Sequence, residues 1–165
     1  MSESLQQQIE KIQQWGRDRK IIGNGTAEGQ WLKLVSEFGE MADNVAKGKP
    51  IEDDIGDQFV VLCMILGICG NNLAMFRDEY EKGETISLAG DMPGAICETL
   101  IELQDLFFMM DRPEGASTEC AIITRHLECL ASLAGTTLHH CIEVAYADIK
   151  DRTGTLLENG VFVKD

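Results

Sequence analysis

The sequence has few prolines, almost no strand-like alternation of polar and apolar residues, and no long apolar run. Only three prolines occur among 165 residues, and residues that favour helices dominate. The longest apolar stretch, Phe59 to Cys69, is too short to span a bilayer and is typical of a buried core helix. These absences argue against a β-sheet protein and a membrane-spanning one, and they predict an all-α fold.

Positive charge and paired cysteines are also scarce. The chain carries 14 Lys and Arg against 28 Asp and Glu, a formal net charge of −14, so neither nucleic acid nor a membrane is expected as a partner. A small anionic substrate stays open, because bound metal ions reverse the local charge. The six cysteines form no C-x-x-C pair and the N-terminus, Met1 to Gln8, is polar. This pattern predicts reduced thiols and a cytoplasmic protein.

Apolar residues recur with helical spacing along most of the chain. The pattern predicts loops at 22–25 and through Pro93, an ordered irregular arm over 153–165, and helices over about 2–19, 26–47, 50–69, 73–82, 94–111, 116–134 and 136–151. We expect a single domain over 1–165. Residues 1–75 would supply metal-binding helices and residues 90–152 a second helical half.

Two acid–apolar–Gly–acid elements are the most informative pattern. Glu37-Phe38-Gly39-Glu40 and Asp54-Ile55-Gly56-Asp57 lie in helical stretches on either side of a turn at Lys47–Pro50. Helix positions i and i+3 lie side by side, and the turn brings the two pairs within about one helical turn of each other. Four carboxylates at a helix seam repel unless cations lie between them. The spacing therefore predicts a Mg²⁺ or Mn²⁺ site with the ligands Glu37, Glu40, Asp54 and Asp57.

Simpler explanations exist for these acids. A solvated helix face, or acids that complement a helix dipole, would also account for them. Gly39 and Gly56 argue for more, because glycine inside a helix costs about 1 kcal/mol relative to alanine and close approach of two helices around a metal would explain that cost. A zinc site involving His126 and Cys129 is a weaker alternative, since its spacing matches no recognised pattern.

Several other residues are candidates for substrate contacts. The cations near the end of the last helix would bind phosphate oxygens, unless they only complement the helix dipole. Lys33 lies one turn before Glu37, a tryptophan could stack on a base unless it is only core, and an asparagine amide could bind a sugar or base unless it only ends a helix. The candidate substrate-binding residues are Trp15, Lys33, Asn71, Lys150, Arg152 and Lys164.

A weak internal repeat appears at an offset of 65 residues. Glu37 falls on Glu102, Glu40 on Asp105 and Asp54 on Glu119, whereas Asp57 falls on Ile122. The repeat indicates a duplicated helical hairpin whose second copy has lost its acids in part. The alternative is coincidence, since helices with an apolar period align readily with one another. Either way, we expect a four-helix-bundle core of antiparallel helical hairpins.

The paired acids resemble a known family. The E-x-G-E element, a basic turn and a D-x-G-D element leading into an apolar helix are similar to the MazG-like branch of the all-α nucleoside triphosphate pyrophosphohydrolases, relatives of the dimeric dUTPases and dCTPases. The similarity is good over about residues 5–75, and the segments 145–152 and 159–164 look like phage and bacterial MazG-like tails. Asp54 departs from the family pattern, which usually has Glu there.

The resemblance implies an activity. Mg²⁺, or Mn²⁺ in its place, would bind a (deoxy)nucleoside triphosphate, and an activated water would attack the α-phosphorus to leave a monophosphate and pyrophosphate. Glu37 or Glu40 would be catalytic and orient that water. The resemblance also implies a homodimer or homotetramer, control of nucleotide pools in a bacterial or phage-infected cytoplasm, and dGTP or GTP as substrates in a phage setting. Competing hypotheses are a non-catalytic acidic interaction module and a hydrolase of another diphosphate-containing nucleotide such as an alarmone.

Overall fold

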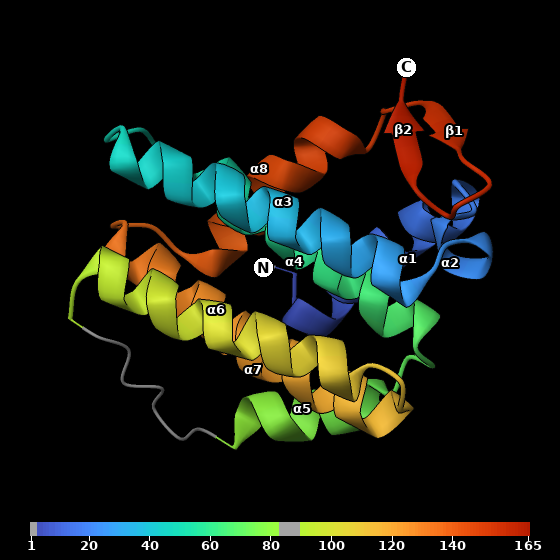
Figure 1. The fold of residues 1–165 in the computed structure, drawn as a ribbon, viewed down its shortest axis with the longest axis horizontal. Helices are drawn as coiled ribbons and strands as arrows, with labels where there is room; N and C mark the ends of the chain where they lie inside the picture. The colour runs from blue at the N-terminus through green and yellow to red at the C-terminus, as the bar shows by residue number, and fades with distance from the viewer. Residues whose placement is uncertain (1–2, 83–89) are drawn as a thin grey trace.

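The computed structural model describes residues 3–82 and 90–165 of the chain. Within these residues it is all-helical apart from one short hairpin (Figure 1), as predicted. The elements are α1 (Leu5–Asp18), α2 (Ile21–Asn24), α3 (Ala27–Ala46), α4 (Glu52–Ile68), α5 (Leu73–Glu81), α6 (Met92–Met109), α7 (Pro113–Leu133), α8 (Leu138–Ile149), β1 (Gly154–Leu156) and β2 (Phe162–Lys164).

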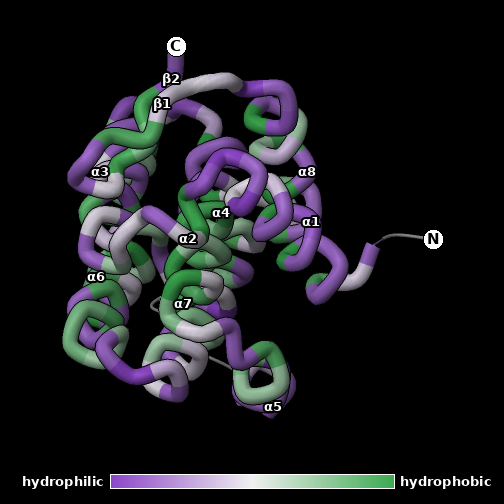
Figure 2. The backbone as a smooth tube through the Cα atoms, turned by 90° about the vertical axis from the view of Figure 1, so that its right-hand side faces the viewer, coloured by the Kyte–Doolittle hydropathy of each residue, from purple (hydrophilic) through white to green (hydrophobic). Residues whose placement is uncertain are grey.

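Two helical hairpins, α3–α4 and α6–α7, form the core of the fold. The helices also contact each other across the hairpins, α4 against α7 and α3 against α6, which closes a four-helix bundle. From Phe59 onward helix α4 is apolar on all sides, and it runs through the middle of the molecule (Figure 2), where α1, α2 and α8 also contact it. Its long buried stretch explains why the sequence shows an uninterrupted apolar run there.

The helix ends repeat at the 65-residue offset. Thr26 caps α3 and Asp91 caps α6, each accepting from the backbone N–H three residues later. Asn72 and Thr137 cap α5 and α8 in the same way. Ahead of these caps, Gly70 and Gly135 both have positive φ, a usual way to end a helix. Capping depends on specific side chains and backbone angles and not on an apolar period, so these matches support a duplication of a three-helix unit.

The two units exchange their last helices. We call α3, α4 and α5 the first unit and α6, α7 and α8 the second unit. Helix α5 of the first unit packs on α7 of the second, and α8 of the second packs on α4 of the first. The exchange is reciprocal, since each unit's last helix packs on the middle helix of the other unit, and α1, α2 and the C-terminal hairpin lie outside the two units. It brings residues of α8 to the acidic helices α3 and α4.

The structure differs from the expected elements at several places. Residues 21–24, labelled α2, make one irregular turn in which Ile22 and Gly23 have non-helical backbone angles, so the expected turn-rich loop there is close to what is seen. The C-terminal arm contains an antiparallel hairpin that pairs Gly154 with Lys164. Pro93 lies in the first turn of α6 instead of the preceding loop, a position where its missing N–H costs little. The expected loop from residue 83 lies in part outside the described residues, as does the expected helix start at Ser2.

The two glycines of the acidic elements do not face each other. A Cβ at Gly56 would clash with the carbonyl oxygen of Cys141 and lie 2.6 Å from the Cβ of Ala145, so this glycine permits close packing of α4 on α8. A Cβ at Gly39 would meet nothing within 4 Å. The expectation that both glycines let α3 and α4 approach each other around a metal is therefore wrong.

All six cysteines are free thiols, three of them buried. Burial raises the pKa of the Cys63, Cys120 and Cys141 thiols, which makes them poor nucleophiles. Among the described helices, none combines the length and apolar character needed to cross a membrane.

Candidate functional site

A cavity of about 570 Å³ lies where α3, α4, the end of α8 and the C-terminal hairpin meet. It contains both acidic and basic side chains and an apolar wall. The charged residues that line it are Lys33, Glu37, Glu40, Asp53, Asp57, Asp148, Arg152 and Lys164. Three of the four predicted metal ligands and four of the six predicted substrate contacts therefore lie at one place.

The carboxylates of this cavity are crowded. Burial raises the pKa of Asp57 to about 7, and Glu37 and Asp53 add to the effect. The pKa of Asp53 is raised by burial and then by Asp148. Glu37 is only 6% exposed, whereas Glu40 lies at the exposed rim. Several negative groups thus share a partly dry space, where their mutual repulsion favours protons or bound cations.

Cations from three elements balance these acids in part. Lys33 forms an ion pair with Glu37 one turn later on α3, and Arg152 pairs with Asp148 at the end of α8. Both cations lower the pKa of Asp57. Lys164 of β2 also lines the cavity. The lining carries five carboxylates and three cations, so it retains negative charge while presenting positive groups to an anionic ligand.

The other side of the cavity is apolar and aromatic. Trp15 is buried, donates from Nε1 to the carbonyl of Ile149 over 2.8 Å, and meets Phe162 edge-on with ring centroids 6.1 Å apart. Val60 and Met64 of α4 continue this wall, and the buried side chain of Gln30 adds an amide to the lining. A flat apolar group of a ligand could lie against this wall while its charged part reaches the acids and cations.

Three predicted site residues do not line the cavity. Asp54 accepts a hydrogen bond from Asn44 over 2.8 Å, and Asn71 accepts one from Gln13 over 2.7 Å. Lys150 is exposed, and its carbonyl accepts from Arg19. Asp53 and Asp57, four residues apart, share the face of α4 that meets the cavity. Asp54 lies beside that face: burial raises its pKa, and the charges of Asp53, Glu40 and Glu37 add to this effect.

Sequence reasoning missed Asp53, Asp148, Gln30 and the apolar hairpin residues that line the cavity beside Lys164. The i, i+4 spacing of Asp53 and Asp57 was a signal that could have found the first. Asp148 lies four residues before Arg152, and this i, i+4 spacing of opposite charges also predicts a contact between the two side chains. Gln30 and Phe162 have no local signal, because only the packing of α8 and the hairpin brings them to α3 and α4.

The donor set suits a hard divalent cation, although the side chains are not yet arranged for one. Carboxylate oxygens are the ligands that Mg²⁺ prefers. Burial, and after it the charges of Glu37 and Asp53, raise the pKa of Asp57, so a cation bound beside it would be stabilised. Among the residues that the structure describes, no three Asp, Glu, His or Cys side chains are gathered into a ready-made metal site. Glu37 would have to leave Lys33 to become a ligand.

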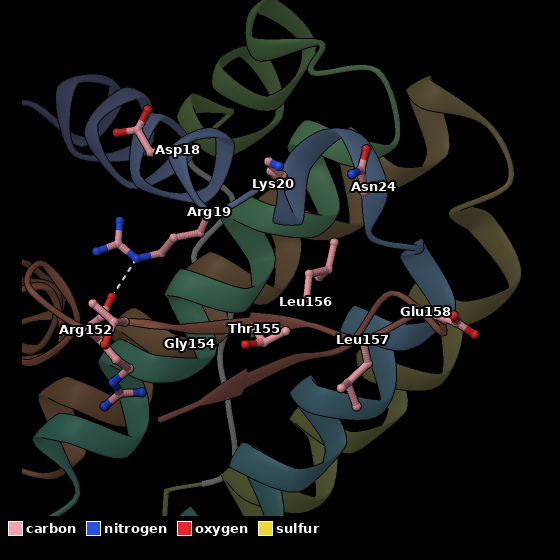
Figure 3. A pocket seen from close by; sticks show the side chains of 11 residues that line it. Asp18, Arg19, Lys20, Asn24, Arg152, Gly154, Thr155, Leu156, Leu157 and Glu158 are labelled. Atoms are coloured by element: carbon pink, nitrogen blue, oxygen red, sulfur yellow. Dashed lines mark hydrogen bonds between the residues drawn. The ribbon is translucent and has the colours of Figure 1, made fainter.

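A second hollow, of about 780 Å³, lies between α1, α2 and the C-terminal hairpin (Figure 3). It is larger but more open to solvent, and its main cation is engaged. Arg19 donates to the backbone carbonyls of Arg152 and Lys150 over 2.8 and 3.0 Å, which closes the end of α8. The Arg152 side chain points away from Arg19 (Figure 3). This hollow therefore lacks the cluster of carboxylates that lines the acidic cavity, and it is the weaker candidate for a functional site.

Comparisons with known proteins give a partial match. No family model and no solved structure matches the chain. A segment of 63 residues is 48% identical to an uncharacterized 18.2 kDa protein from the rep–hol intergenic region of Haemophilus phage HP1. The match covers 37% of this chain and 39% of that protein, so the chain spans about two fifths of the length of the curated relative it matches.

Proposed function

We propose that this protein is a nucleoside triphosphate pyrophosphohydrolase of the MazG-like type. It would convert a (deoxy)nucleoside triphosphate to the monophosphate and pyrophosphate. The observation that carries the proposal is the cavity, which combines clustered carboxylates, three cationic side chains and an aromatic wall. A nucleotide needs all three kinds of contact, namely a metal site for its triphosphate, cations for its phosphate oxygens and a flat apolar surface for its base.

Mg²⁺ would be held by Glu37, Glu40, Asp53 and Asp57. When bound, it neutralises phosphate charge and acidifies water. Arg152 and Lys164 would bind the phosphate oxygens and stabilise charge that develops on them. Lys33, released from Glu37, would do the same from α3.

Acidic residues of the chain would also position the attacking water and accept its proton. Glu37 or Glu40 would orient a water molecule toward the α-phosphorus and accept its proton. The new bond joins the water oxygen to the α-phosphorus, the bond from that phosphorus to the bridging oxygen breaks, and pyrophosphate leaves. Trp15 and Phe162 would hold the base and exclude bulk water from this side of the cavity.

A nucleotide panel tests the activity. The protein is incubated with Mg²⁺ and each NTP and dNTP, and the products are separated by ion exchange. We expect monophosphate and pyrophosphate, and a loss of about a hundredfold or more in Asp57→Asn. Asp43→Asn, an exposed change on α3 outside the cavity, should stay active. Release of orthophosphate, or no reaction with any nucleotide, contradicts the proposal; the latter result would favour an interaction module.

The setting and the assembly are part of the proposal. The partial phage relative and the six free thiols support a role in the cytoplasm of an infected bacterium, so dGTP and GTP are the first substrates to test. Helices α3 and α6 run side by side (Figure 1), and the exposed apolar side chains that they carry support a homo-oligomer. They are Leu32, Val35, Leu100, Ile101, Phe107 and Phe108, and we call this surface the α3/α6 face.

A further inference from the structure

Gln30 differs from the other buried glutamines of the described chain. Three of the four, Gln8, Gln13 and Gln58, each make at least one side-chain hydrogen bond, at 2.9, 2.7 and 3.2 Å respectively. Gln30 is only 6% exposed, yet none of the hydrogen bonds among the described residues involves its side-chain amide. Buried amides are normally hydrogen-bonded, so this group keeps its full capacity for a bound molecule.

The side chain of Gln30 belongs to the face of α3 that meets the acidic cavity. Gln30, Lys33 and Glu37 are spaced by three and four residues, so their side chains leave the helix on one face. All three line the cavity. The free amide is therefore in the same space as the charged groups to which the proposed function assigns the phosphates and the metal ion.

The cavity is acidic at one end and apolar at the other. Helices α3 and α4 run antiparallel on either side of the turn at Lys47–Pro50, so the acids of both helices gather toward that turn. Farther from the turn, the lining of α4 becomes Val60, Val61 and Met64. The C-terminal hairpin covers the start of α3, where a Cβ at Gly29 would lie 3.8 Å from Cγ2 of Val161. Gln30 is thus a polar group in the apolar end.

The position of Gln30 suits contact with a nucleobase. It precedes Glu37 by seven residues, which is about 10 Å along the axis of α3 and comparable to the reach of a nucleotide from its phosphate to the far edge of its base. A carboxamide presents an acceptor oxygen beside an NH₂ donor, and glutamine pairs with base edges through both. A ligand that covers the amide without bonding it leaves a buried polar group unpaired, which disfavours that ligand.

We propose that Gln30 reads the edge of the nucleobase, and that the site selects bases that carry a hydrogen-bond donor and an acceptor side by side. This inference rests on the proposed function and names the part of the substrate that Gln30 recognises. Because no described residue fixes the amide, it turns over to suit either order of donor and acceptor. Adenine and guanine therefore both fit, whereas unsubstituted purine, which lacks exocyclic amino and oxo groups, leaves the amide oxygen unpaired.

Binding of nucleotides that cannot be cleaved tests this role. The full chain is titrated calorimetrically, with Mg²⁺, against the α,β-imido triphosphates of adenosine, guanosine and purine riboside. We expect the first two to bind at least about tenfold more tightly than the third. Gln30→Met keeps the length of the side chain without the amide, so it should weaken the first two and leave the third unchanged. Gln14→Met, the same change at an exposed position of α1 outside the cavity, should keep the preference.

A spectroscopic measurement on the wild-type protein keeps the test independent of how Gln30→Met folds. The side-chain amide signal of Gln30 should shift with the adenosine compound and much less with the purine riboside compound. Equal affinities for the three compounds, binding of only one natural base, or an unchanged preference in Gln30→Met would overturn the inference without touching the proposed hydrolysis. Conversely, a Gln30-dependent preference in a protein that cleaves no nucleotide would overturn the hydrolysis alone. If none of the three compounds binds, both are wrong.

Discussion

At the scale of single residues, Asp57 is the group whose ionisation depends most on its surroundings in the cavity. Its pKa is raised to about 7 from 3.8 in an ordinary aspartate. Between these values the folded state binds more protons than the unfolded state, so this group makes the protein less stable as pH rises. Above about pH 7 the destabilising effect is complete, because the carboxylate is then charged in both states.

Asp57→Asn should therefore stabilise the metal-free protein at pH 8 and have little effect near pH 4. Thermal unfolding in a chelator at the two pH values measures the difference. Asp78→Asn makes the same change at an exposed position on α5 and should not show this pH dependence. If Asp57→Asn lowered the melting temperature at pH 8, Asp57 would instead contribute a structural contact.

The sequence predicted many of the cavity's charged residues but did not single out Asp53. The carboxylates of Glu37, Glu40 and Asp57 line the cavity together with Asp53, whereas Asp54, the fourth predicted metal ligand, lies beside them outside the lining. The repeated motif made Asp54 and Asp57 look like a pair. Which face of α4 meets the cavity depends on how α8 packs at Gly56, and that long-range contact has no local signature.

At the scale of helices, Gly56 and Gly39 have opposite surroundings. Gly56→Ala would force α8 away from α4 and should destabilise the protein by about 1–3 kcal/mol. Gly39→Ala adds a methyl group in open space and should stabilise α3 by about 1 kcal/mol. Urea unfolding at low protein concentration measures both. Equal effects of the two changes would contradict the close contact between α4 and α8.

The helices were easier to predict than the strands. Long apolar periods and capping residues gave most helix ends to within a few residues. Strands β1 and β2 have three residues each, which is too short for an alternating pattern. Their pairing depends on the turn at Gly160, where φ is positive, and on contacts of the hairpin with the body of the molecule, such as Phe162 against Trp15.

At the scale of the whole molecule, the α3/α6 face predicts self-association. Phe108 belongs to this face and is 66% exposed. Its ring contacts Phe107, which in turn packs on Trp31. Phe108→Asp should shift the protein toward the monomer in sedimentation velocity, since a buried charge without a partner is costly. Leu157→Asp, at an exposed position in the C-terminal hairpin, should not. A wild-type protein that is monomeric at high concentration would contradict the assembly.

The exchange of last helices between the two units has a consequence for how the chain must fold. A fragment ending after α5 would expose the apolar flank of α4 that α8 covers, and a fragment beginning at α6 would lack the cover that α5 gives α7. Each half alone would therefore leave part of its hydrophobic surface exposed to water. The molecule should therefore be stable only when both halves are present, and the same exchange brings Arg152 to the acids of the other half.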